Sequence, residues 1–311
     1  MDPMHPTAPN GTEPPERAAK PRLTRRRFVA ASAGVLGLSA TATAAYAGAV
    51  EPSELIVTRY ALNPSGWPAG RKLTVTAIAD LHAGGPDMTL PRVRGVVDAA
   101  QALQADLIVL LGDFKAWYGY FKSEPVADPL WAAELSRLKA PLGTWAILGN
   151  HDWWHDLAGV RSALAGVDIP LLENNAVLLG ESGRRFWLAG LGDQLAHRLG
   201  HGEFRGVDDL PGTLAQIKTD DPVLLLAHEP DIFPDVPARV ALTLAGHTHG
   251  GQIRVPLIWP YYVPSRYGAR YAYGHVVEDG RHLIVSGGLG TSIIPARLGV
   301  PPEIVHVTLG A

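Results

Sequence analysis

The chain contains no cysteine among its 311 residues, and only 18% of them are charged. The absence of cysteine excludes disulfide bonds and thiolate metal sites, and it leaves no thiol to be oxidised in an oxidising compartment. Basic residues are not in excess, because 27 Lys and Arg stand against 30 Asp and Glu, a formal net charge of −3. Neither a nucleic-acid-binding surface nor an acidic tail is indicated. The hydrophobic content of 47% is enough for a globular domain with a sizeable core.

The sequence also lacks three motifs of common catalytic sites. It has no Gly-x-Ser-x-Gly elbow for a serine nucleophile, no Walker loop, and no Gly-x-Gly-x-x-Gly after an apolar run. These absences disfavour a Ser-His-Asp hydrolase and the two common nucleotide-binding loops.

The first 49 residues differ in composition from the rest of the chain. Residues 1–21 are rich in proline, alanine and polar residues, which predicts disorder. Arg25, Arg26 and Arg27 follow, and no charged residue then occurs from Phe28 to Val50, a pattern typical of an export signal. The arginine pair followed by Phe28 resembles a bacterial twin-arginine (Tat) signal.

A membrane anchor is the alternative interpretation of the same segment. Its 23 uncharged residues could span a bilayer, but Leu, Ile, Val and Phe are sparse among them. Cleavage after Ala45-Tyr46-Ala47 and retention as an anchor both stay open. Residues 50–311 are expected to form one domain. Beyond residue 47 the chain carries 21 Lys and Arg against 27 Asp and Glu, so this domain is mildly acidic.

Polar residues follow three apolar runs that have the character of buried strands. The runs cover residues 73–79, 106–111 and 144–148 and lead into Asp80, Asp113 and Asn150, which lie 33 and 37 residues apart. Apolar residues at helical spacing occupy 90–103 and 131–138 between them. This period predicts right-handed βαβ units in an α/β fold, with three parallel strands side by side. Their carboxyl ends would bring the polar residues to one edge.

Shorter strands are predicted in the second half of the chain, at 171–179, 185–191, 223–227, 240–245, 283–285 and 304–307. Two of them end at further polar residues, since His228 follows 223–227 and His247 and His249 follow 240–245. Residues 256–273 are rich in aromatic residues and proline and predict a long surface loop. Aromatic residues in such a loop more often pack against the rest of the protein than contact a substrate. Three of them could still line a substrate site: Trp259, Tyr261 and Tyr262.

The side chains at these strand ends are carboxylates, imidazoles and one amide, which suit Zn, Mn, Fe and similar ions. A carboxylate can bridge two ions through its two oxygens. Two ions about 3.5–4 Å apart can clamp a phosphate and activate a water molecule. A single histidine is more often a core or surface residue, so the prediction of a two-metal site depends on the shared placement of these residues at strand ends.

The ordered motifs resemble those of the calcineurin-like metallophosphoesterase superfamily. Between residues 73 and 252 they are Asp80-x-His82, Gly112-Asp113, Gly149-Asn150-His151-Asp152, His228 and Gly246-His247-x-His249. The C-terminal stretch with Gly288 to Ser292, Arg297 and Pro301 to Ile304 resembles the bacterial branch typified by YkuE and YaeI phosphoesterases, whose members can be exported by the Tat route. The resemblance implies a four-layer α-β-β-α sandwich with two mixed sheets and a dinuclear metal site at the carboxyl ends of the strands.

The resemblance also implies a role for each site residue. One metal ion, whether Mn, Zn or Fe, would be bound by Asp80, His82, Asp113 and His249. The second would be bound by Asp113, Asn150, His228 and His247, so that Asp113 bridges the two. His151 would face the phosphate and protonate the leaving oxygen, Asp152 would orient His151, and a metal-bridging hydroxide would be the nucleophile.

These features predict a metal-dependent phosphoester hydrolase exported through the Tat translocase to the periplasm, the outer face of the cytoplasmic membrane or the cell wall. The branch favours a phosphodiester or pyrophosphate bond in a small-molecule or lipid substrate of the envelope, and association with a membrane surface is compatible with such a substrate. A broad-specificity phosphomonoesterase is the alternative. A non-catalytic scaffold on the same fold is disfavoured because every motif residue is present.

The sequence differs from the protein Ser/Thr phosphatases of the superfamily at two places, and these differences narrow the expected substrate class. The residues after Asp113 are Phe114, Lys115 and Ala116, where protein Ser/Thr phosphatases of the superfamily have an Asp-Arg-Gly, and Trp153-Trp154 follows where they have a phosphate-binding arginine. Protein phosphatase activity is therefore not expected. The acidic domain also argues against a nucleic-acid substrate, whose backbone requires basic contacts.

Replacing Arg25 and Arg26 with lysine tests the export signal, because the change keeps the charge but removes the arginine pair. We expect the precursor to stay in the cytoplasm, as measured by cell fractionation. The matched control replaces Arg17 and Arg22 with lysine outside the motif and should leave export intact. Undiminished translocation of the first variant would contradict the assignment.

Overall fold

The computed structural model describes residues 37, 39–116, 124–255 and 262–311. The chain divides into two compact units, residues 1–43 and 44–311. In the first unit only residues 37 and 39–43 are described, and they are helical. The predicted disordered stretch and the arginine pair therefore lie outside the described residues. Within the described part, no helix combines the length and apolar character needed to cross a membrane.

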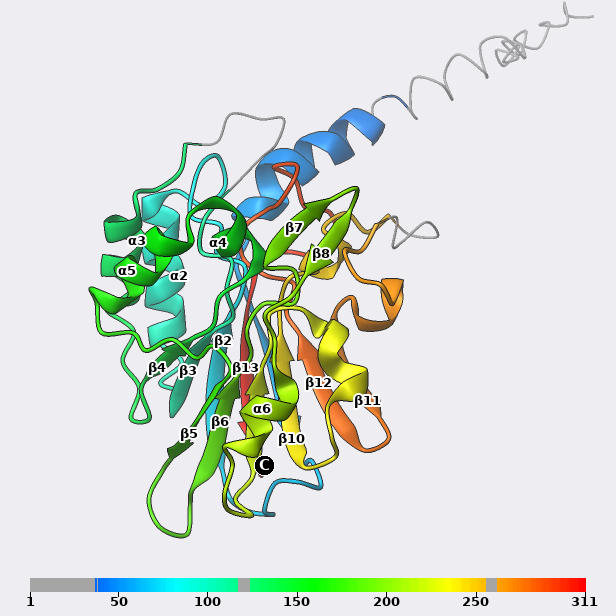
Figure 1. Ribbon diagram of the computed structural model, residues 1–311. Helices are drawn as coiled ribbons and strands as arrows, with labels where there is room; N and C mark the ends of the chain where they lie inside the picture. The colour runs from blue at the N-terminus through cyan, green and yellow to red at the C-terminus, as the bar shows by residue number, and fades with distance from the viewer. Residues whose placement is uncertain (1–36, 38, 117–123, 256–261) are drawn as a thin grey trace, which may run out of the picture. The chain divides into compact units, whose positions relative to one another are not determined.

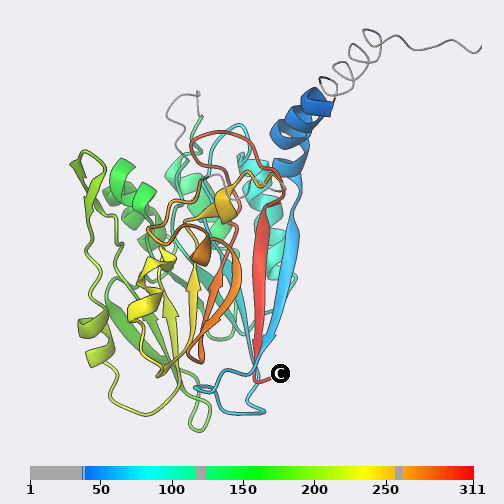
Figure 2. The same ribbon diagram turned by 90° about the vertical axis from the view of Figure 1, so that its right-hand side faces the viewer.

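The first sheet of the second unit has five strands in the order β1 (Ile56–Leu62), β13 (Glu303–Leu309), β2 (Leu73–Ile78), β3 (Leu107–Leu110) and β4 (Thr144–Ala146). Strands β2, β3 and β4 are parallel neighbours, as the period of the sequence predicts. All four residues of β3 are buried, which explains its continuous apolar run. Figure 2 shows the last strand, β13 in red, beside β1 in blue.

The second sheet has six strands in the order β11 (Gly274–Glu278), β12 (Arg281–Val285), β10 (Val240–Ala245), β9 (Val223–Leu226), β6 (Phe186–Gly190) and β5 (Asn175–Leu179). The four central strands are parallel, and β11 and β5 join them antiparallel at the two edges. Both sheets are therefore mixed, which confirms the predicted α/β fold with two mixed sheets.

The two sheets pack face to face around an apolar core that includes Val109, Leu224, Leu242 and Val307, all fully buried. Helices α2 (Leu90–Gln101), α3 (Asp128–Leu135) and α5 (Leu157–Ala165) cover the outer face of the first sheet (Figure 1).

The outer face of the second sheet is covered by shorter elements. These are α6 (Leu210–Ala215) and the 3-10 helices Pro230–Asp235 and Gly268–Tyr271. The outer layer on this side is therefore thinner than the helical layer on the first sheet.

Several elements were not predicted from the sequence. Strand β1 reads Ile-Val-Thr-Arg-Tyr-Ala-Leu and is only partly buried at a sheet edge, so it lacks a continuous apolar run. The hairpin of β7 (His197–Gly200) and β8 (Glu203–Arg205) is mostly exposed. Helix α4 (Asn150–His155) begins inside the motif Gly149-Asn150-His151-Asp152, where no helix was predicted. The strand predicted from residue 171 begins only at Asn175.

The surface loop predicted at 256–273 is wrong in part. Tyr271 is fully buried and packs edge-on against Phe233 on the outer face of the second sheet, with ring centroids 5.7 Å apart. Tyr262 is 58% exposed, and Trp259 and Tyr261 lie outside the described residues.

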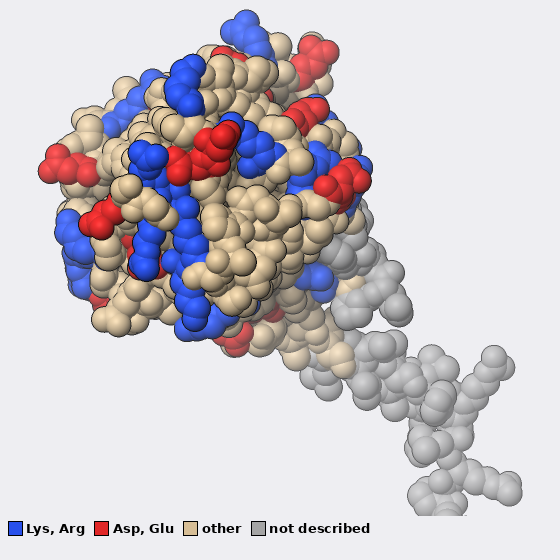
Figure 3. Space-filling model, turned by 90° about the horizontal axis from the view of Figure 1, so that it is seen from below, with Lys and Arg blue, Asp and Glu red and all other residues tan. Residues whose placement is uncertain are grey.

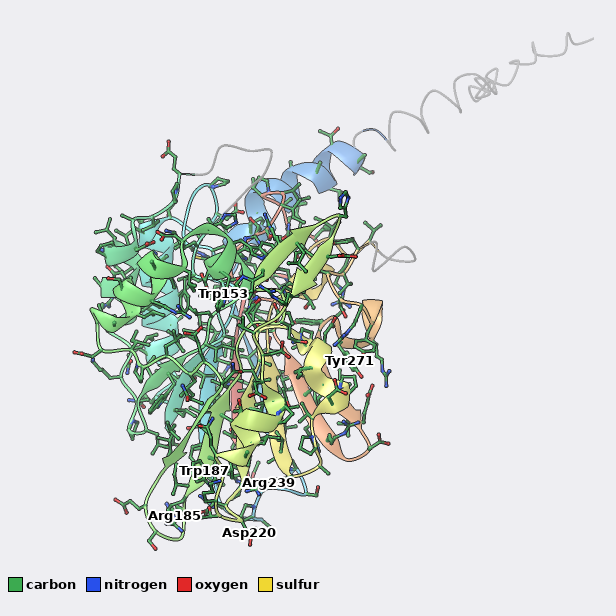
Figure 4. All side chains as sticks on the ribbon, in the orientation of Figure 1. Trp153, Arg185, Trp187, Asp220, Arg239 and Tyr271 are labelled. Carbon is green, nitrogen blue, oxygen red and sulfur yellow. The ribbon has the colours of Figure 1, made fainter. Side chains whose placement is uncertain are left out.

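The two ends of the sheets differ. Trp153, on α4, lies at the end where the polar motifs gather, whereas Arg185, Trp187, Asp220 and Arg239 lie at the opposite end (Figure 4). On the face seen in Figure 3, which views the molecule from that opposite end, basic and acidic side chains are interspersed.

Substituting Leu224 with alanine tests the core between the sheets. The side chain is completely shielded from water, so its removal leaves a cavity and should lower the free energy of unfolding by about 2–5 kcal/mol in urea titrations. Leu130 is 50% exposed on α3, and Leu130→Ala is the matched control, with an expected change below about 0.5 kcal/mol. Equal effects would contradict this packing.

Candidate metal centre

Seven candidate ligands and two neighbouring residues come together at the carboxyl ends of strands from both sheets. Strands β2, β3 and β4 lead to the residues from the first half of the chain, and β9 and β10 lead to the histidines from the second half. All nine are buried: Asp80, His82, Asp113, Asn150, His151, Asp152, His228, His247 and His249. Burying so many polar groups is costly unless they are paired or hold ions.

Four of the residues form a first group. His82 Nε2 lies 3.2 Å from His249 Nε2 and 3.6 Å from Asp113 Oδ2. His249 Nε2 lies 3.7 Å from Asp80 Oδ1. Imidazole nitrogens and carboxylate oxygens therefore face the same small space.

A second group shares Asp113 with the first. His228 Nε2 lies 3.3 Å from Asp113 Oδ2 and 3.2 Å from Asn150 Oδ1. His247 approaches the same amide oxygen through Nδ1, at 2.8 Å. The structure thus places every predicted ligand in one of two groups, joined by the Asp113 carboxylate.

Backbone carbonyls determine which ring nitrogen faces the centre in two of the histidines. His82 Nδ1 donates to the Lys115 carbonyl at 2.9 Å, and His228 Nδ1 donates to the Leu111 carbonyl at 2.6 Å. Because a carbonyl can only accept, Nδ1 carries a proton, so in the neutral ring Nε2 presents its lone pair to the centre. In metal-ligating histidines the ring nitrogen away from the metal commonly donates to such a backbone or carboxylate oxygen.

The backbone is held in unusual conformations around the centre. Five candidate ligands have positive φ angles between 44° and 68°: Asp80, His82, Asp113, His247 and His249. Such conformations cost free energy in residues other than glycine, and they persist only where the surrounding structure enforces them. Gly149 gives the closest approach, since a Cβ there would lie 2.3 Å from Asp113 Oδ1.

The two carboxylates at the centre have opposite pKa shifts. Burial raises the pKa of Asp80 to about 7, with His228 opposing the change and Asp113 adding to it. Burial also acts against ionisation of Asp113, but the charges of His228, His151 and His82 outweigh it and hold its pKa well below the usual range. Cations among these groups would favour the ionised form of both carboxylates.

His151 lies beside the first group, with its ring centroid 4.8 Å from that of His82. Its backbone N–H donates to Asp113 Oδ1 at 2.8 Å. Its side-chain Nε2 is 3.3 Å from the Ser292 hydroxyl, and its Nδ1 is buried without a hydrogen-bond partner. Burial lowers the pKa of His151 well below its usual value.

The predicted role of Asp152 as the partner that orients His151 is wrong. Its carboxylate instead accepts three backbone N–H groups, from Asp113 at 2.9 Å, Phe114 at 2.8 Å and Gly149 at 3.0 Å. The physical reason is the position of Asp152 in the first turn of α4, where its side chain reaches back to the residue that caps the helix. Asp152 therefore ties the loop that carries Asp113 to the start of α4.

Two residues near the centre were present in the C-terminal motif but had no predicted role. Ser292 contacts His151, as described above. Arg297 is fully buried behind His249, and its guanidinium donates to the carbonyls of Gly290, Gly287 and Val300 and contacts His249 Nδ1 at 3.2 Å. In the sequence, Arg297 stands among apolar residues near the C-terminus. That setting could have indicated a buried arginine whose guanidinium is fully hydrogen-bonded.

The β7–β8 hairpin contributes a third set of neighbours that sequence patterns did not indicate. Phe204 stacks on Trp154 with ring centroids 5.5 Å apart, and the Arg198 guanidinium lies 3.6 Å from the centroid of the same ring. Trp154 in turn lies 5.4 Å from His151. The hairpin is exposed and short, so neither periodicity nor hydrophobicity marks it in the sequence.

The Asp152→Asn substitution tests the corrected role of this carboxylate. One acceptor oxygen becomes an NH2 group facing backbone donors, so the free energy of unfolding should fall by about 1–3 kcal/mol in urea titrations. Asp279→Asn is the control, because Asp279 is 89% exposed. If both variants were equally stable, the three amide contacts would not be significant for folding.

The chain is similar to known phosphoesterases over most of its length. Residues 73–251 match the family model described as calcineurin-like phosphoesterase. The chain is 30% identical to the uncharacterized metallophosphoesterase YkuE of Bacillus subtilis, over 93% of this chain and 98% of that protein. It is also 30% identical to the phosphodiesterase YaeI of Escherichia coli, over 92% of this chain and 99% of that protein.

Among solved structures, the 5'-nucleotidase precursor of Thermus thermophilus matches 76% of this chain at 15% identity with a TM-score of 0.44, and the match spans 55% of that protein. The family match covers more than half of the chain, from the first strand that leads to the centre to the residues just after His249. The chain therefore belongs to the calcineurin-like phosphoesterase family, and it is a hydrolase that acts on phosphoester bonds.

Proposed function

We propose that this protein hydrolyses a phosphodiester or pyrophosphate bond with the help of two metal ions held at the carboxyl ends of its strands. The observation that carries the proposal is the sharing of Asp113 between two groups of nitrogen and oxygen donors. The first ion would be held by Asp80, His82, Asp113 and His249. The second would be held by Asp113, Asn150, His228 and His247.

The donor set fits such ions. The Nε2 lone pairs of His82 and His228 face the centre, and two carboxylates are buried there with opposite pKa shifts. Imidazole, carboxylate and amide oxygen are suitable ligands for Mn, Zn or Fe. When bound, two such ions supply Lewis acidity and an activated water molecule next to the phosphorus atom.

Asn150 and His151 set the charge and the orientation of groups around these ions. The amide oxygen of Asn150 adds no negative charge, so its side of the centre stays more electron-poor than the side with two carboxylates. The backbone N–H of His151 fixes one oxygen of Asp113. The His151 imidazole lies at the edge of the centre. Burial lowers its pKa, but the negative charge of a bound phosphate would favour the protonated ring, which would then give a proton to the leaving oxygen of the substrate.

Exposed apolar side chains near His151 support a substrate with a lipid-like part. Ile293 and Ile294, directly after Ser292, are 48% and 38% exposed. Phe204 and Leu199 on the hairpin beside Trp154 are 40% and 55% exposed. Such side chains can contact an acyl chain or a membrane surface. We propose an envelope lipid or wall precursor as the substrate, reached after Tat export on the outer side of the cytoplasmic membrane.

The test is an activity panel on the exported domain after removal of metal and reloading with Mn, Zn or Fe. We expect hydrolysis of bis-p-nitrophenyl phosphate, weaker hydrolysis of p-nitrophenyl phosphate, and cleavage of UDP-diacylglucosamine in mixed micelles. A preference for p-nitrophenyl phosphate would favour the phosphomonoesterase alternative. No hydrolysis of any phosphoester with any of the metals would refute the proposed function.

Two substitutions separate metal binding from proton transfer. Asn150→Ala should lower both activity and the metal content measured by elemental analysis, because it removes a ligand. His151→Ala should lower kcat for diphenyl phosphate, whose poor leaving group needs a proton, about 10²- to 10⁴-fold with the metal content unchanged, because it removes a general acid. Loss of metal from the His151→Ala protein would mean that the imidazole is a ligand and that this assignment is wrong.

A further inference from the structure

We propose that Ser292 positions the His151 imidazole for proton transfer, and that the Gln252 side chain holds Ser292 in place. The inference deepens the proposed function and rests on it for the catalytic role of His151. In this proposal Ser292 takes the role of orienting His151 that the sequence had suggested for Asp152.

The Ser292 hydroxyl is in direct contact with the catalytic candidate. Its Oγ lies 3.3 Å from His151 Nε2. Among the residues that the structure describes, no other group forms a hydrogen bond with this ring, since Nδ1 has no partner and both Asp152 oxygens accept backbone N–H groups. The orientation of the His151 ring therefore depends on Ser292 and on packing.

Gln252 fastens the loop that carries Ser292 on both sides. Its Oε1 accepts the Ser292 backbone N–H at 2.9 Å, and its Nε2 donates to the Ile294 carbonyl at 2.8 Å. Gln252 is itself 9% exposed, and its backbone N–H donates to the His249 carbonyl at 2.9 Å. One side chain thus connects the strand end that carries His249 to the loop that reaches His151.

The backbone of this loop is in a conformation that it would not adopt alone. Ile293, between the two residues that Gln252 holds, has φ 68°, and Gln252 has φ 53°. Positive φ is especially unfavourable for a β-branched residue such as isoleucine. Strain of this kind collects where the surrounding structure imposes a particular geometry for function. Here the imposed geometry brings the Ser292 hydroxyl to the His151 ring.

The two residues before Ser292, Gly290 and Thr291, are also held by hydrogen bonds. The Thr291 hydroxyl donates to the Asp87 carboxylate, and Thr291 is fully buried. The buried Arg297 guanidinium donates to the Gly290 carbonyl, and the Gly290 N–H donates to the Asp80 carbonyl at 2.8 Å. The loop is therefore anchored before and after Ser292.

A hydroxyl suits a ring that gives away a proton. It can accept a hydrogen bond from Nε2–H and can donate one to Nε2 without a proton, whereas a carboxylate can only accept. In the step proposed, the one Nε2–H is shared between the Ser292 oxygen and the leaving oxygen, and its proton passes to the leaving oxygen as the bond from that oxygen to phosphorus breaks. Ser292 keeps its own proton and turns to donate to the vacated nitrogen, so the ring keeps its orientation.

The test compares substrates that differ in their need for protonation. In Ser292→Ala, kcat for diphenyl phosphate, which has a poor leaving group, should fall about 3- to 15-fold, corresponding to the loss of one hydrogen bond. The kcat for bis-p-nitrophenyl phosphate, whose leaving group departs without a proton, should change less than twofold. KM and metal content should stay unchanged, and Ser292→Thr should restore the rate because its hydroxyl remains.

Two further variants complete the design. Gln252→Ala should reproduce the substrate dependence of Ser292→Ala, because it releases the loop. Ser136→Ala is the matched control, since the Ser136 hydroxyl donates to the Ala133 carbonyl on the surface of α3, and it should leave both rates unchanged. Equal losses for the two substrates in Ser292→Ala would overturn the positioning role.

A readout independent of turnover separates this inference from the proposed function. In ¹⁵N-histidine spectra of the metal-loaded protein, the His151 side-chain signals should shift in Ser292→Ala and return in Ser292→Thr. If the wild-type protein hydrolyses no phosphoester, the proposed function fails, yet the spectra still decide the hydrogen bond. Unmoved His151 signals in Ser292→Ala would overturn the inference even in an active enzyme.

Discussion

The structure depends on the burial of two carboxylates, Asp80 and Asp113, among histidines at one end of two packed sheets. Burying like charges together is unfavourable unless cations or hydrogen bonds compensate. Backbone amides donate to both carboxylates, and backbone carbonyls orient the rings of His82 and His228. The positive φ angles of five candidate ligands add a further cost. Burial of the apolar core between the sheets stabilises the fold and offsets the cost of these buried charges.

The arrangement of the centre could be predicted from the sequence where it follows from regular structure. Parallel strands and crossover helices have a fixed period, so Asp80, Asp113 and Asn150 were expected at one sheet edge, and β2, β3 and β4 are parallel neighbours. His228, His247 and His249 come from the second sheet. The periodicity of the sequence does not show that the second sheet packs on the first. Only the family resemblance implied that packing.

Contacts made by loops could not be predicted, because no period governs them. The sequence neighbourhood of His151 and Asp152 suggested a pair, yet the geometry of the first helical turn directs Asp152 to backbone amides. The hydroxyl that forms a hydrogen bond with the His151 ring belongs to Ser292, 141 positions later, in a strained loop. The buried Tyr271 was missed for a related reason, since its partner Phe233 lies in a separate 3-10 helix.

The central proposal is that two metal ions would share Asp113 as a ligand. The most direct measurement is an anomalous difference map from crystals of the metal-loaded protein, recorded at the absorption edge of the bound metal. The account predicts two peaks about 3.5–4 Å apart with the Asp113 carboxylate between them and Asn150 beside one of them. A single peak, or two peaks away from Asp113, would contradict it.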